Sequence, residues 1–551
     1  MNIVRFAPSP TGNVHIGNIR TAIFNWLFAR HTKGQFLLRI EDTDKERSTK
    51  EAIDRLLECM DWLGLDHDSD IFYQSSQEEL HIKAAMKMLS HGNAYSSKNS
   101  DNSDKKTIVF KLPYDCSTVK NVREVGVAEF NIDPGKPVRI ALDGLKFFYI
   151  NEKKKSVETA ASLAGFKGLK VYDENGSVVF ELEKHISEIH KSDCAFSFEN
   201  CSKISFIRRE VFYKDLIKGE LAKPLDTMKD FVILRSDSSP IFHLSNVYDD
   251  ITQKVTHIIR GDDHVENTYK HLFLFWALGA DIPNYGHMPM IVNHQGKPYS
   301  KRDGDAFVGD FREKGYLSDA LFNYLSLLGW SPGDNREKMT RSEMVEAFSL
   351  DRVKSAPAQF DIVKLLNING LYMAELQDDI FLSLARTEAE KQLWLDSSLD
   401  SKLFSDVAEL MKSRVKLISQ VADWKYFFFD ESPLFSGTGG YTAELNSKAF
   451  SYDEKGLKKA FKEKDSTIGA LSEFMRIFRQ RSFACAACYE SSIRDTEKEL
   501  SLQEGKLNQP LRIVLTGTPS GADLANTMAI LGKDRIINRL EKLLTIINGV
   551  F

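Results

Sequence analysis

The chain has 551 residues, enough for several domains, and its apolar (42%) and charged (27%) fractions are those of an ordinary globular protein. Its net charge of −5 excludes a uniformly basic nucleic-acid binder, so RNA would have to be held by local basic patches. It has neither an apolar run as long as a membrane span nor a basic-then-apolar leader, so we expect no membrane partner and a cytoplasmic location.

The first forty residues predict a strand, a helix and a second strand. Residues 1–6 are a short apolar run, apolar side chains recur at helical spacing between residues 19 and 27, and residues 36–40 are apolar again. This order predicts a parallel sheet, which binds ligands at the carboxyl ends of its strands. His15 and Gly17 lie in the turn at that end, where a helix N-terminus and an imidazole can receive an anion.

The next segment predicts two helices and then a change of character. Ser48, with Glu51 three residues later, predicts a capping box for a helix that stops at Gly64. Another helix is expected over residues 77–89, and the polar stretch 96–106 is expected to be a loop.

Residues 107–210 alternate as strands do. Asn175-Gly176 between two apolar runs predicts a hairpin, so we expect a folded β-rich segment. The lysines at 153–155 favour a solvated loop over an RNA contact.

Alternation of strands and helices returns after this segment. Residues 255–260 predict a strand and residues 268–278 a helix, so one sheet domain is expected to be split by an insertion. From about residue 311 onward the pattern is helical, with amphipathic stretches at 403–421 and 531–547.

A second motif, Ser300-Lys301-Arg302-Asp303-Gly304, follows Gly296-Lys297 far downstream of His15. The two motifs in this order resemble those of class I aminoacyl-tRNA synthetases. Further segments narrow the resemblance to the bacterial-type glutamyl-tRNA synthetases, and these are residues 5–12, 39–44, 230–261, 319–331 and 512–532. The resemblance covers most of the chain except roughly residues 116–208.

The resemblance implies an α/β fold, namely a class I synthetase Rossmann-like parallel-sheet domain split by an α+β insertion and followed by a helical anticodon-binding C-terminal half. The related glutaminyl enzymes share the catalytic half but have β-barrels at the C-terminal end. The helical pattern at the end of this chain therefore favours a resemblance to the glutamyl enzymes. The expected domains are the catalytic halves at 1–95 and 226–310, an acceptor-end-binding insertion at 96–225 with its extra β-rich segment at about 116–208, a stem-contact helical domain at 311–375 and a helical anticodon-binding domain at 376–551.

The implied activity is that of a glutamate–tRNA ligase. ATP and L-glutamate would form glutamyl-adenylate and pyrophosphate, and the glutamyl group would pass to the 3′ end of tRNA(Glu) with release of AMP. Mg²⁺ is expected with ATP, and the chain is expected to be a monomer. Two alternatives stay open: a non-discriminating enzyme that also charges tRNA(Gln), and a non-catalytic tRNA-binding paralogue.

The matched motifs imply which residues handle ATP. His15 would donate to the charge that develops on the α-phosphate, Gly17 would leave room for the adenosine, and Lys301 would face the β- and γ-phosphates. These three are the expected catalytic residues. The expected ATP site is completed by Asn18, Ser300 and Arg302.

A glutamate substrate needs cationic partners for its carboxylates and an anionic partner for its ammonium group. Arg5 would form a bidentate pair with the side-chain carboxylate, with Arg260 as the second cation, and Glu41 would hold the ammonium group. Alternatively, Arg5 and Glu41 could pair with each other. The other expected glutamate-binding residues are Ser9, Phe242 and Asn246.

Three departures from the family pattern matter. Pro298 stands where the second motif usually has its first lysine, and Lys297 is one position early. Phe242 stands where the family often has a tyrosine, so a hydroxyl is lost from the substrate site. Ser97 and Asn99 stand where many members have zinc cysteines, so no zinc or other protein-bound metal is expected.

Cys485 and Cys488 have the spacing of metal ligands. A structural zinc needs four ligands, however, and no second cysteine pair lies nearby in the sequence. Two thiols on one helical turn in a Phe- and Ala-rich segment therefore predict core packing.

Overall fold

The computed structural model describes residues 1–44, 47–98, 106–133, 135–141, 146–150, 156–186, 195–395, 399–430, 432 and 448–550. The chain divides into two compact units. The first consists of Met1–Gly309 with Leu325–Phe360, and the second of Asp310–Tyr324 with Asp361–Phe551. The expected boundaries at 95, 225, 310 and 375 stay predictions.

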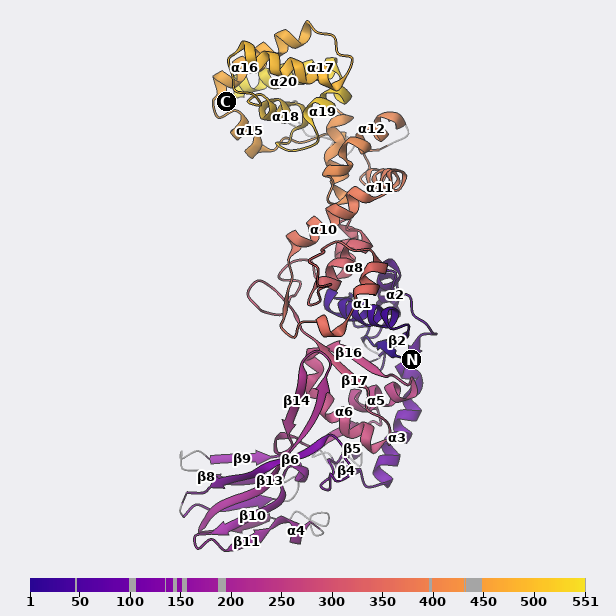
Figure 1. Ribbon diagram of the computed structural model, residues 1–551, viewed down its shortest axis with the longest axis vertical. Coiled ribbons are helices and arrows are strands. Elements are labelled where there is room, and N and C mark those ends of the chain that lie inside the picture. Colours follow the sequence, from indigo (N-terminus) through magenta and orange to yellow (C-terminus); the bar gives the residue numbers. More distant parts are fainter. Residues whose placement is uncertain are drawn as a thin grey trace. The chain divides into compact units, whose positions relative to one another are not determined.

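Parallel strands form the framework of the first unit (Figure 1). β1 (Ile3–Phe6) pairs with β2 (Gln35–Ile40), which pairs with β3 (Phe72–Tyr73). On the other side of β1, the backbone N–H of Thr256 donates to the Ile3 carbonyl at 2.9 Å, which brings β16 (His257–Gly261) alongside. β16 in turn pairs in parallel with β17 (Asn284–Met288). The predicted strand–helix–strand order of residues 1–40 is confirmed, and strands from before and after the insertion lie side by side.

Helices follow these strands because each strand is succeeded by an apolar pattern of helical period. Thr49 caps α2 by accepting a hydrogen bond from the Ala52 N–H at 3.3 Å, so the prediction of Ser48 as the cap is wrong by one residue. The two hydroxyl residues are adjacent and both suit a cap, so the pattern could not separate them. The other elements of this part are α1 (Ile16–His31), α2 (Lys50–Trp62), α3 (Glu78–Ser90), α5 (Phe242–Thr252), α6 (Val265–Ala277), β18 (Ile291–Val292), α9 (Arg341–Ala347) and β19 (Ala358–Gln359). Two helices, α7 (Val308–Glu313) and α8 (Ser318–Leu327), cross the boundaries between the two units.

The segment between the halves of the parallel sheet is mostly β-structure. The expected loop at 96–106 is partly wrong, because β4 (Ala94–Lys98) pairs antiparallel with β5 (Lys106–Phe110), and β5 pairs with β15 (Phe231–Leu234). Serine and lysine on an exposed strand gave that stretch the composition of a loop. The remaining elements are β6 (Val122–Asn131), β7 (Val138–Ala141), β8 (Lys146–Ile150), β9 (Ser156–Ala160), β10 (Lys167–Asp173), β11 (Val178–Glu181), α4 (Leu182–His185), β12 (Ala195–Phe198), β13 (Cys201–Asp215) and β14 (Gly219–Pro224).

These strands enclose a hydrophobic core of their own, which confirms the expected folded β-rich segment. Phe166, Phe180 and Phe206 are among its buried side chains. The predicted hairpin is present between β10 and β11, where Gly176 has φ +81° and its N–H donates to the Asp173 carbonyl at 3.1 Å. The lysines at 153–155 lie outside the described residues.

The second unit is helical, as predicted, around a core that includes Trp394 and Trp424. The expected amphipathic stretch 403–421 is only partly one helix, because α12 ends at Met411 and 3₁₀ turns follow at Lys412–Arg414 and Ile418–Phe427. Among the described residues, no helix is long and apolar enough to cross a membrane. The α-helices are α10 (Ile362–Glu375), α11 (Asp378–Lys391), α12 (Ser401–Met411), α15 (Glu454–Ala460), α16 (Lys464–Arg479), α17 (Ala486–Glu499), α18 (Asn508–Thr516), α19 (Leu524–Leu531) and α20 (Lys533–Val550).

Candidate active site

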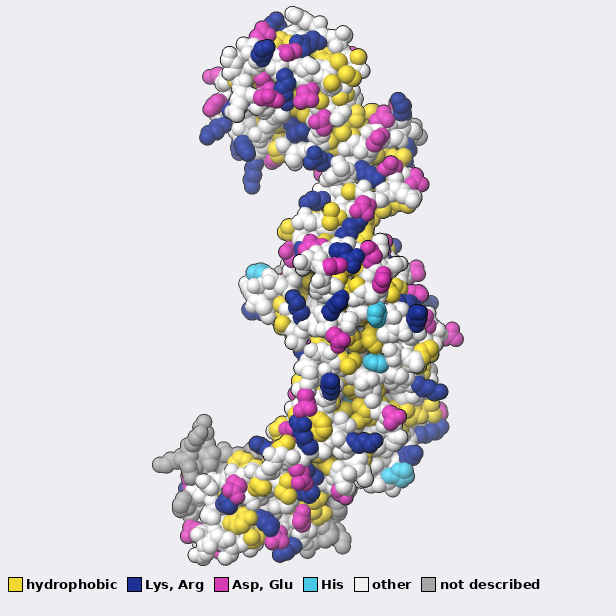
Figure 2. Space-filling view, viewed as in Figure 1, with side chains coloured by type: hydrophobic (Ala, Val, Ile, Leu, Met, Phe, Trp, Pro, Cys, Tyr) yellow, Lys and Arg dark blue, Asp and Glu magenta, His cyan; other side chains and the backbone are white. Residues whose placement is uncertain are grey.

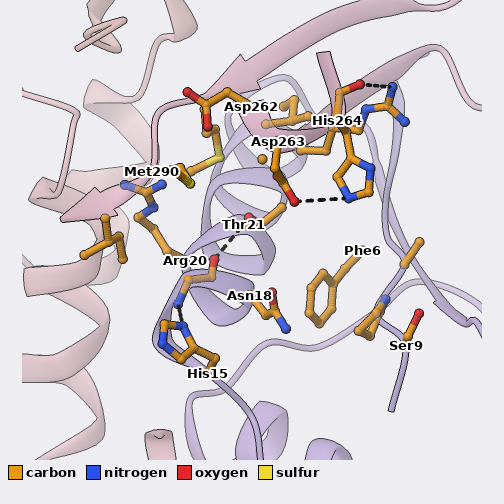
Figure 3. Close-up of a pocket in the computed structure, with 18 of the residues that line it drawn as sticks. Phe6, Ser9, His15, Asn18, Arg20, Thr21, Asp262, Asp263, His264 and Met290 are labelled. Carbon is orange, nitrogen blue, oxygen red and sulfur yellow. Dashed lines mark hydrogen bonds and ion pairs between the residues drawn. The ribbon is translucent and has the colours of Figure 1, made fainter. Parts of the chain in front are cut away.

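A cavity of about 560 Å³ opens at the carboxyl ends of β1, β2, β16 and β17, where a parallel sheet is expected to bind ligands. The predicted site residues among its lining are Arg5, Ser9, His15, Gly17, Asn18, Glu41, Phe242, Asn246 and Arg260. Pro298 and Tyr299 also line the cavity, but Ser300, Lys301 and Arg302, which follow them directly, do not. Figure 3 shows His15 and Asn18 on the helix side of the cavity and Asp263 and His264 across from them.

The two sequence motifs meet at the start of α1. The Ile16 N–H donates to the Ala306 carbonyl at 2.9 Å and the Val308 N–H donates to the Val14 carbonyl at 3.0 Å, which forms a bridge between His15 and Phe307. The imidazole of His15 stands edge-on to the Phe307 ring, with centroids 6.2 Å apart. The ammonium of Lys301, an exposed residue, lies 5.7 Å from the centroid of the same ring. Residues 300–307 therefore lie beside the helix N-terminus.

His15 is the N-cap of α1. Its Nδ1 accepts a hydrogen bond from the Gly17 N–H at 3.0 Å, so Nδ1 carries no proton and a neutral ring must hold its proton on Nε2. Burial lowers the pKa of His15, and a backbone hydrogen bond at Tyr299 opposes this only in part. The neutral ring is therefore a fixed Nε2–H donor at the cavity wall.

A buried charge network lies beneath the cavity and joins Arg5 to Glu41 indirectly. Asp250 accepts from Arg5 Nε at 2.9 Å and from Arg39 Nη1 at 2.6 Å, and Arg39 Nη2 is 3.3 Å from Glu41 Oε1. Arg5 therefore forms its ion pair with Asp250. The alternative prediction of a direct pair between Arg5 and Glu41 is wrong. Two arginines around Asp250 hold its pKa below the usual value although burial acts to raise it.

The pKa of Glu41 shifts in the opposite direction to that of Asp250, because the effect of burial exceeds the effect of its hydrogen-bonding and cationic partners. Burial raises its pKa, and the nearby Arg39 and Arg5 and a hydrogen bond from Asn246 offset this only in part. Glu41 thus lines the cavity as a buried carboxylate with an incomplete set of cationic partners, which suits a ligand that brings an ammonium group.

One face of α5 supplies three residues to this region. Phe242, Asn246 and Asp250 are four residues apart, so they lie in a row along the helix. Asn246 Nδ2 donates to Glu41 Oε1 at 2.8 Å, while its Oδ1 is buried with no hydrogen-bond partner among the described residues. The Phe242 ring packs against the His264 ring, with centroids 5.5 Å apart, and it brings no hydroxyl to the cavity wall.

Arg260 is held by a relay of side chains. Its Nε donates to His287 Nε2 at 3.2 Å, and the other ring nitrogen, Nδ1, lies 2.6 Å from Asp215 Oδ2. Burial lowers the pKa of His287 while Asp215 opposes this, which favours a neutral ring that accepts from Arg260 and donates to Asp215. Arg260 Nη1 is buried without a partner among the described residues, although it lines the cavity wall. A ligand carboxylate would satisfy it.

Metal binding has no support from geometry. Among the described residues, no group of three or more His, Cys, Asp or Glu side chains is placed to hold an ion. Ser97 lies in β4, and Asn99 lies outside the described residues. The predicted absence of zinc stays a prediction.

The prediction of core packing for Cys485 and Cys488 is wrong. Cys485 is exposed and Cys488 is partly exposed at the start of α17. The neighbouring aromatic residues form the core without them, since Phe483 stacks on Tyr489 with centroids 4.2 Å apart.

Four residues that position the side chains of the site by hydrogen bonds were not predicted as site residues from the sequence. Two had a signal: Arg39 is two residues before Glu41 at the end of a strand, and Asp250 is four residues after Asn246 on a helix. Asp215 and His287 had none, because 72 residues separate them and only the tertiary fold brings them together.

Comparison with known proteins is consistent with this geometry. The family model "tRNA synthetases class I (E and Q), catalytic domain" matches residues 2–107 and 193–367, and the model "Anticodon binding domain" matches residues 381–544. "Glutamate--tRNA ligase 2" of Thermoanaerobacter pseudethanolicus is 31% identical over 98% of this chain and 97% of its own length. "Glutamate--tRNA ligase 2" of Zymomonas mobilis is 33% identical over 99% and 97%.

A solved structure supports the fold. The crystal structure of a glutamate tRNA ligase from Elizabethkingia meningosepticum in complex with its amino acid superposes with a TM-score of 0.66, at 24% identity and with 100% of both chains covered. The expected α/β fold with a class I catalytic domain and a helical C-terminal part is confirmed. By the extent of these matches, the chain belongs to the class I tRNA synthetases of the glutamate–tRNA ligase family.

Proposed function

We propose that this chain activates L-glutamate with ATP and transfers it to the 3′ end of tRNA(Glu), which makes it an ATP-dependent glutamate–tRNA ligase. The observation that carries the proposal is the meeting of the two motifs at one cavity: the bridge between His15 and Phe307 places residues 300–307 beside a wall that also carries Arg5, Glu41 and Arg260. Class I family membership implies ATP, and the names of the full-length relatives support glutamate and tRNA as the other substrates.

The cavity offers a partner for each charged group of glutamate. Asp250 engages Nε and Nη2 of Arg5, so a substrate carboxylate would approach from Nη1 and the outer proton of Nη2. Arg260 Nη1 is free to take the second carboxylate, and Glu41 to take the ammonium group. Ser9 and the Asn246 amide oxygen would complete these contacts with neutral hydrogen bonds.

ATP would bind along the N-terminus of α1. The neutral His15 would donate from Nε2 to the α-phosphate as the glutamate carboxylate attacks it, and Gly17 and Asn18 would leave room for the nucleoside. Lys301 and Arg302 are exposed cations that would reach the β- and γ-phosphates, with Ser300 as a neutral neighbour. Mg²⁺ would enter with the nucleotide and would neutralise part of the charge on its phosphates.

Binding of tRNA would depend on local basic groups. Lys, Arg, Asp and Glu side chains are interspersed on the face shown in Figure 2. In the β-rich segment, Lys167 pairs with Glu124 at 2.8 Å. Direct phosphate contacts from a few unpaired cations would give an affinity that depends strongly on salt.

A charging assay tests the proposal and separates its alternatives. The protein is incubated with labelled glutamate, ATP and Mg²⁺, and with purified tRNA(Glu) or tRNA(Gln) in separate reactions. Charging of tRNA(Glu) alone is the expected result. Charging of both tRNAs would establish a non-discriminating enzyme, and charging of neither would favour the non-catalytic paralogue. Gel filtration of the same sample would test the expected monomer.

A further inference from the structure

Two cysteines lie side by side at the N-terminus of α17, in the segment that matches the anticodon-binding model. This helix belongs to the second unit, whereas the residues that line the cavity belong to the first. Cys485 is the N-cap and Cys488 is the third residue of the helix. Their Sγ atoms are 3.4 Å apart, and the Cys488 N–H donates to the Cys485 carbonyl at 3.0 Å. Cys485 is exposed and Cys488 is partly exposed, so a small reagent can reach the pair.

The surroundings of Cys488 favour its thiolate form. A hydrogen bond from the backbone at Ala484 and one from the Cys485 thiol lower the pKa of Cys488. The first turn of a helix adds to this effect, because its free N–H groups stabilise a negative charge. Burial has the opposite effect on Cys116 and Cys201, where it raises the pKa. The buried Cys116 and Cys201 therefore serve as comparison thiols for the exposed pair.

Closure of a disulfide between the pair needs little movement. The S–S bond is about 2.05 Å long, so the two sulfur atoms must approach by about 1.4 Å. Cys485 is in extended backbone, with φ −157° and ψ 168°, and precedes the first helical residue. Rotation of its side chain therefore leaves the helix hydrogen bonds in place. A metal ion would need further ligands, and no group of three or more His, Cys, Asp or Glu side chains among the described residues is placed to hold one.

We propose that Cys485 and Cys488 form a redox-active dithiol that exchanges with small-molecule disulfides of the glutathione type. The Cys488 thiolate attacks one sulfur of the reagent, which forms a mixed disulfide and releases one thiolate of the reagent. The Cys485 thiol then loses its proton to water and attacks Cys488 Sγ. This step forms the Cys485–Cys488 disulfide and releases the second thiolate, so two protein thiols are oxidised as one disulfide is reduced to two thiols.

The test uses the full-length protein and glutathione disulfide at neutral pH. Free thiols are alkylated at intervals, and the protein is digested and analysed by mass spectrometry. The expected product is a peptide linked between Cys485 and Cys488, with Cys116 and Cys201 still reduced. Recovery of both Cys485 and Cys488 as alkylated thiols, or linkage of either to another cysteine, would overturn the proposal.

Single substitutions test the order of attack. Cys485→Ser removes the resolving thiol, so a mixed disulfide with glutathione should accumulate on Cys488. Cys488→Ser leaves only the thiol of Cys485, whose side chain makes no N-cap hydrogen bond, so its adduct should form at least about tenfold more slowly. An equal or faster reaction of Cys488→Ser would contradict the assignment of Cys488 as the attacking group. Both variants should retain glutamate-dependent ATP formation, because neither residue lines the cavity, and this activity serves as the folding control.

Discussion

Glu41 is kept in the cavity wall at a cost to the fold. Burial raises its pKa, so ionised Glu41 is less favourable in the folded chain than in the unfolded one. A carboxyl whose pKa is raised on folding adds stability that is fully present below its unfolded pKa and is lost as the pH rises through its folded pKa. Ionised Glu41 is therefore a charge that a bound ammonium group would help to compensate.

Glu41→Gln should separate binding from stability. The neutral amide removes the buried charge, so the free energy of unfolding at pH 7 should be equal or higher than in the wild type, and the difference should shrink as the pH falls towards 4. The kcat/KM for glutamate should fall by about 10- to 100-fold, because a charge-assisted hydrogen bond is lost. Denaturant unfolding at several pH values and steady-state kinetics measure the two effects. A less stable variant at pH 7 with normal glutamate kinetics would refute this role of Glu41.

Phe242 offers a gain-of-function test at the same wall. A tyrosine hydroxyl at this position would reach towards the charged groups of the substrate, and such a hydrogen bond contributes about 1–3 kcal/mol. Phe242→Tyr should therefore lower the KM for glutamate by about tenfold and leave the KM for ATP unchanged. If both KM values stay the same, the cavity does not place the substrate carboxylate near this ring.

At the scale of elements, the N-terminus of α1 combines a structural and a chemical task in one side chain. His15 Nδ1 caps the helix, and its other ring nitrogen, Nε2, is the one that would donate to a ligand, in exchange for its backbone hydrogen bond at Tyr299. An asparagine can provide the cap through its Oδ1 but has no donor at the Nε2 position.

His15→Asn and His15→Ala should therefore differ in stability and agree in activity. Both should slow activation by about 10² to 10³-fold, the effect of removing one preorganised donor. Only His15→Ala should also lose about 1 kcal/mol of unfolding free energy. Pyrophosphate exchange and thermal unfolding are the two measurements. An asparagine variant with normal exchange would reduce His15 to a helix cap.

The ends of β13 and β17 meet where Asp215 and His287 hold Arg260. His287→Leu should raise the KM for glutamate by about tenfold or more, since the guanidinium loses the group that orients it, while the KM for ATP should not change. His287→Gln keeps an acceptor near the Nε2 position and should recover part of the loss. Equal KM values for glutamate in both variants and the wild type would show that the relay does not position Arg260.

The sequence predicts most of the local elements but not the contacts that depend on the tertiary fold. Apolar period and turn residues predict β1, α1, β2 and the Asn175–Gly176 hairpin, because local interactions set these elements. The same patterns predict the cap of α2 one residue too early, and they predict a loop where the structure has strand β4. The relay behind Arg260 could not be predicted, because it depends on tertiary contacts.

In the whole molecule, the first motif and the segment that follows the second motif, almost 300 residues apart along the sequence, are joined by the bridge between His15 and Phe307. Neither motif alone specifies a reaction. In the proposed function, their placement near Arg5, Glu41 and Arg260 would let a nucleotide and an amino acid bind in contact with each other. Pro298 and Tyr299 line the cavity while Lys301 lies beyond it over Phe307, so Lys301 would act on the outer phosphates.

Glutamate-dependent exchange of pyrophosphate into ATP, measured with tRNA(Glu) present, tests the central claim most directly. The wild type should catalyse exchange only when glutamate is added. Lys301→Ala should lower the rate by about 10²-fold or more, and the neighbouring Lys297→Ala, the matched control, should have a much smaller effect. Absence of glutamate-dependent exchange in the wild type, or a larger loss in Lys297→Ala than in Lys301→Ala, would contradict the account.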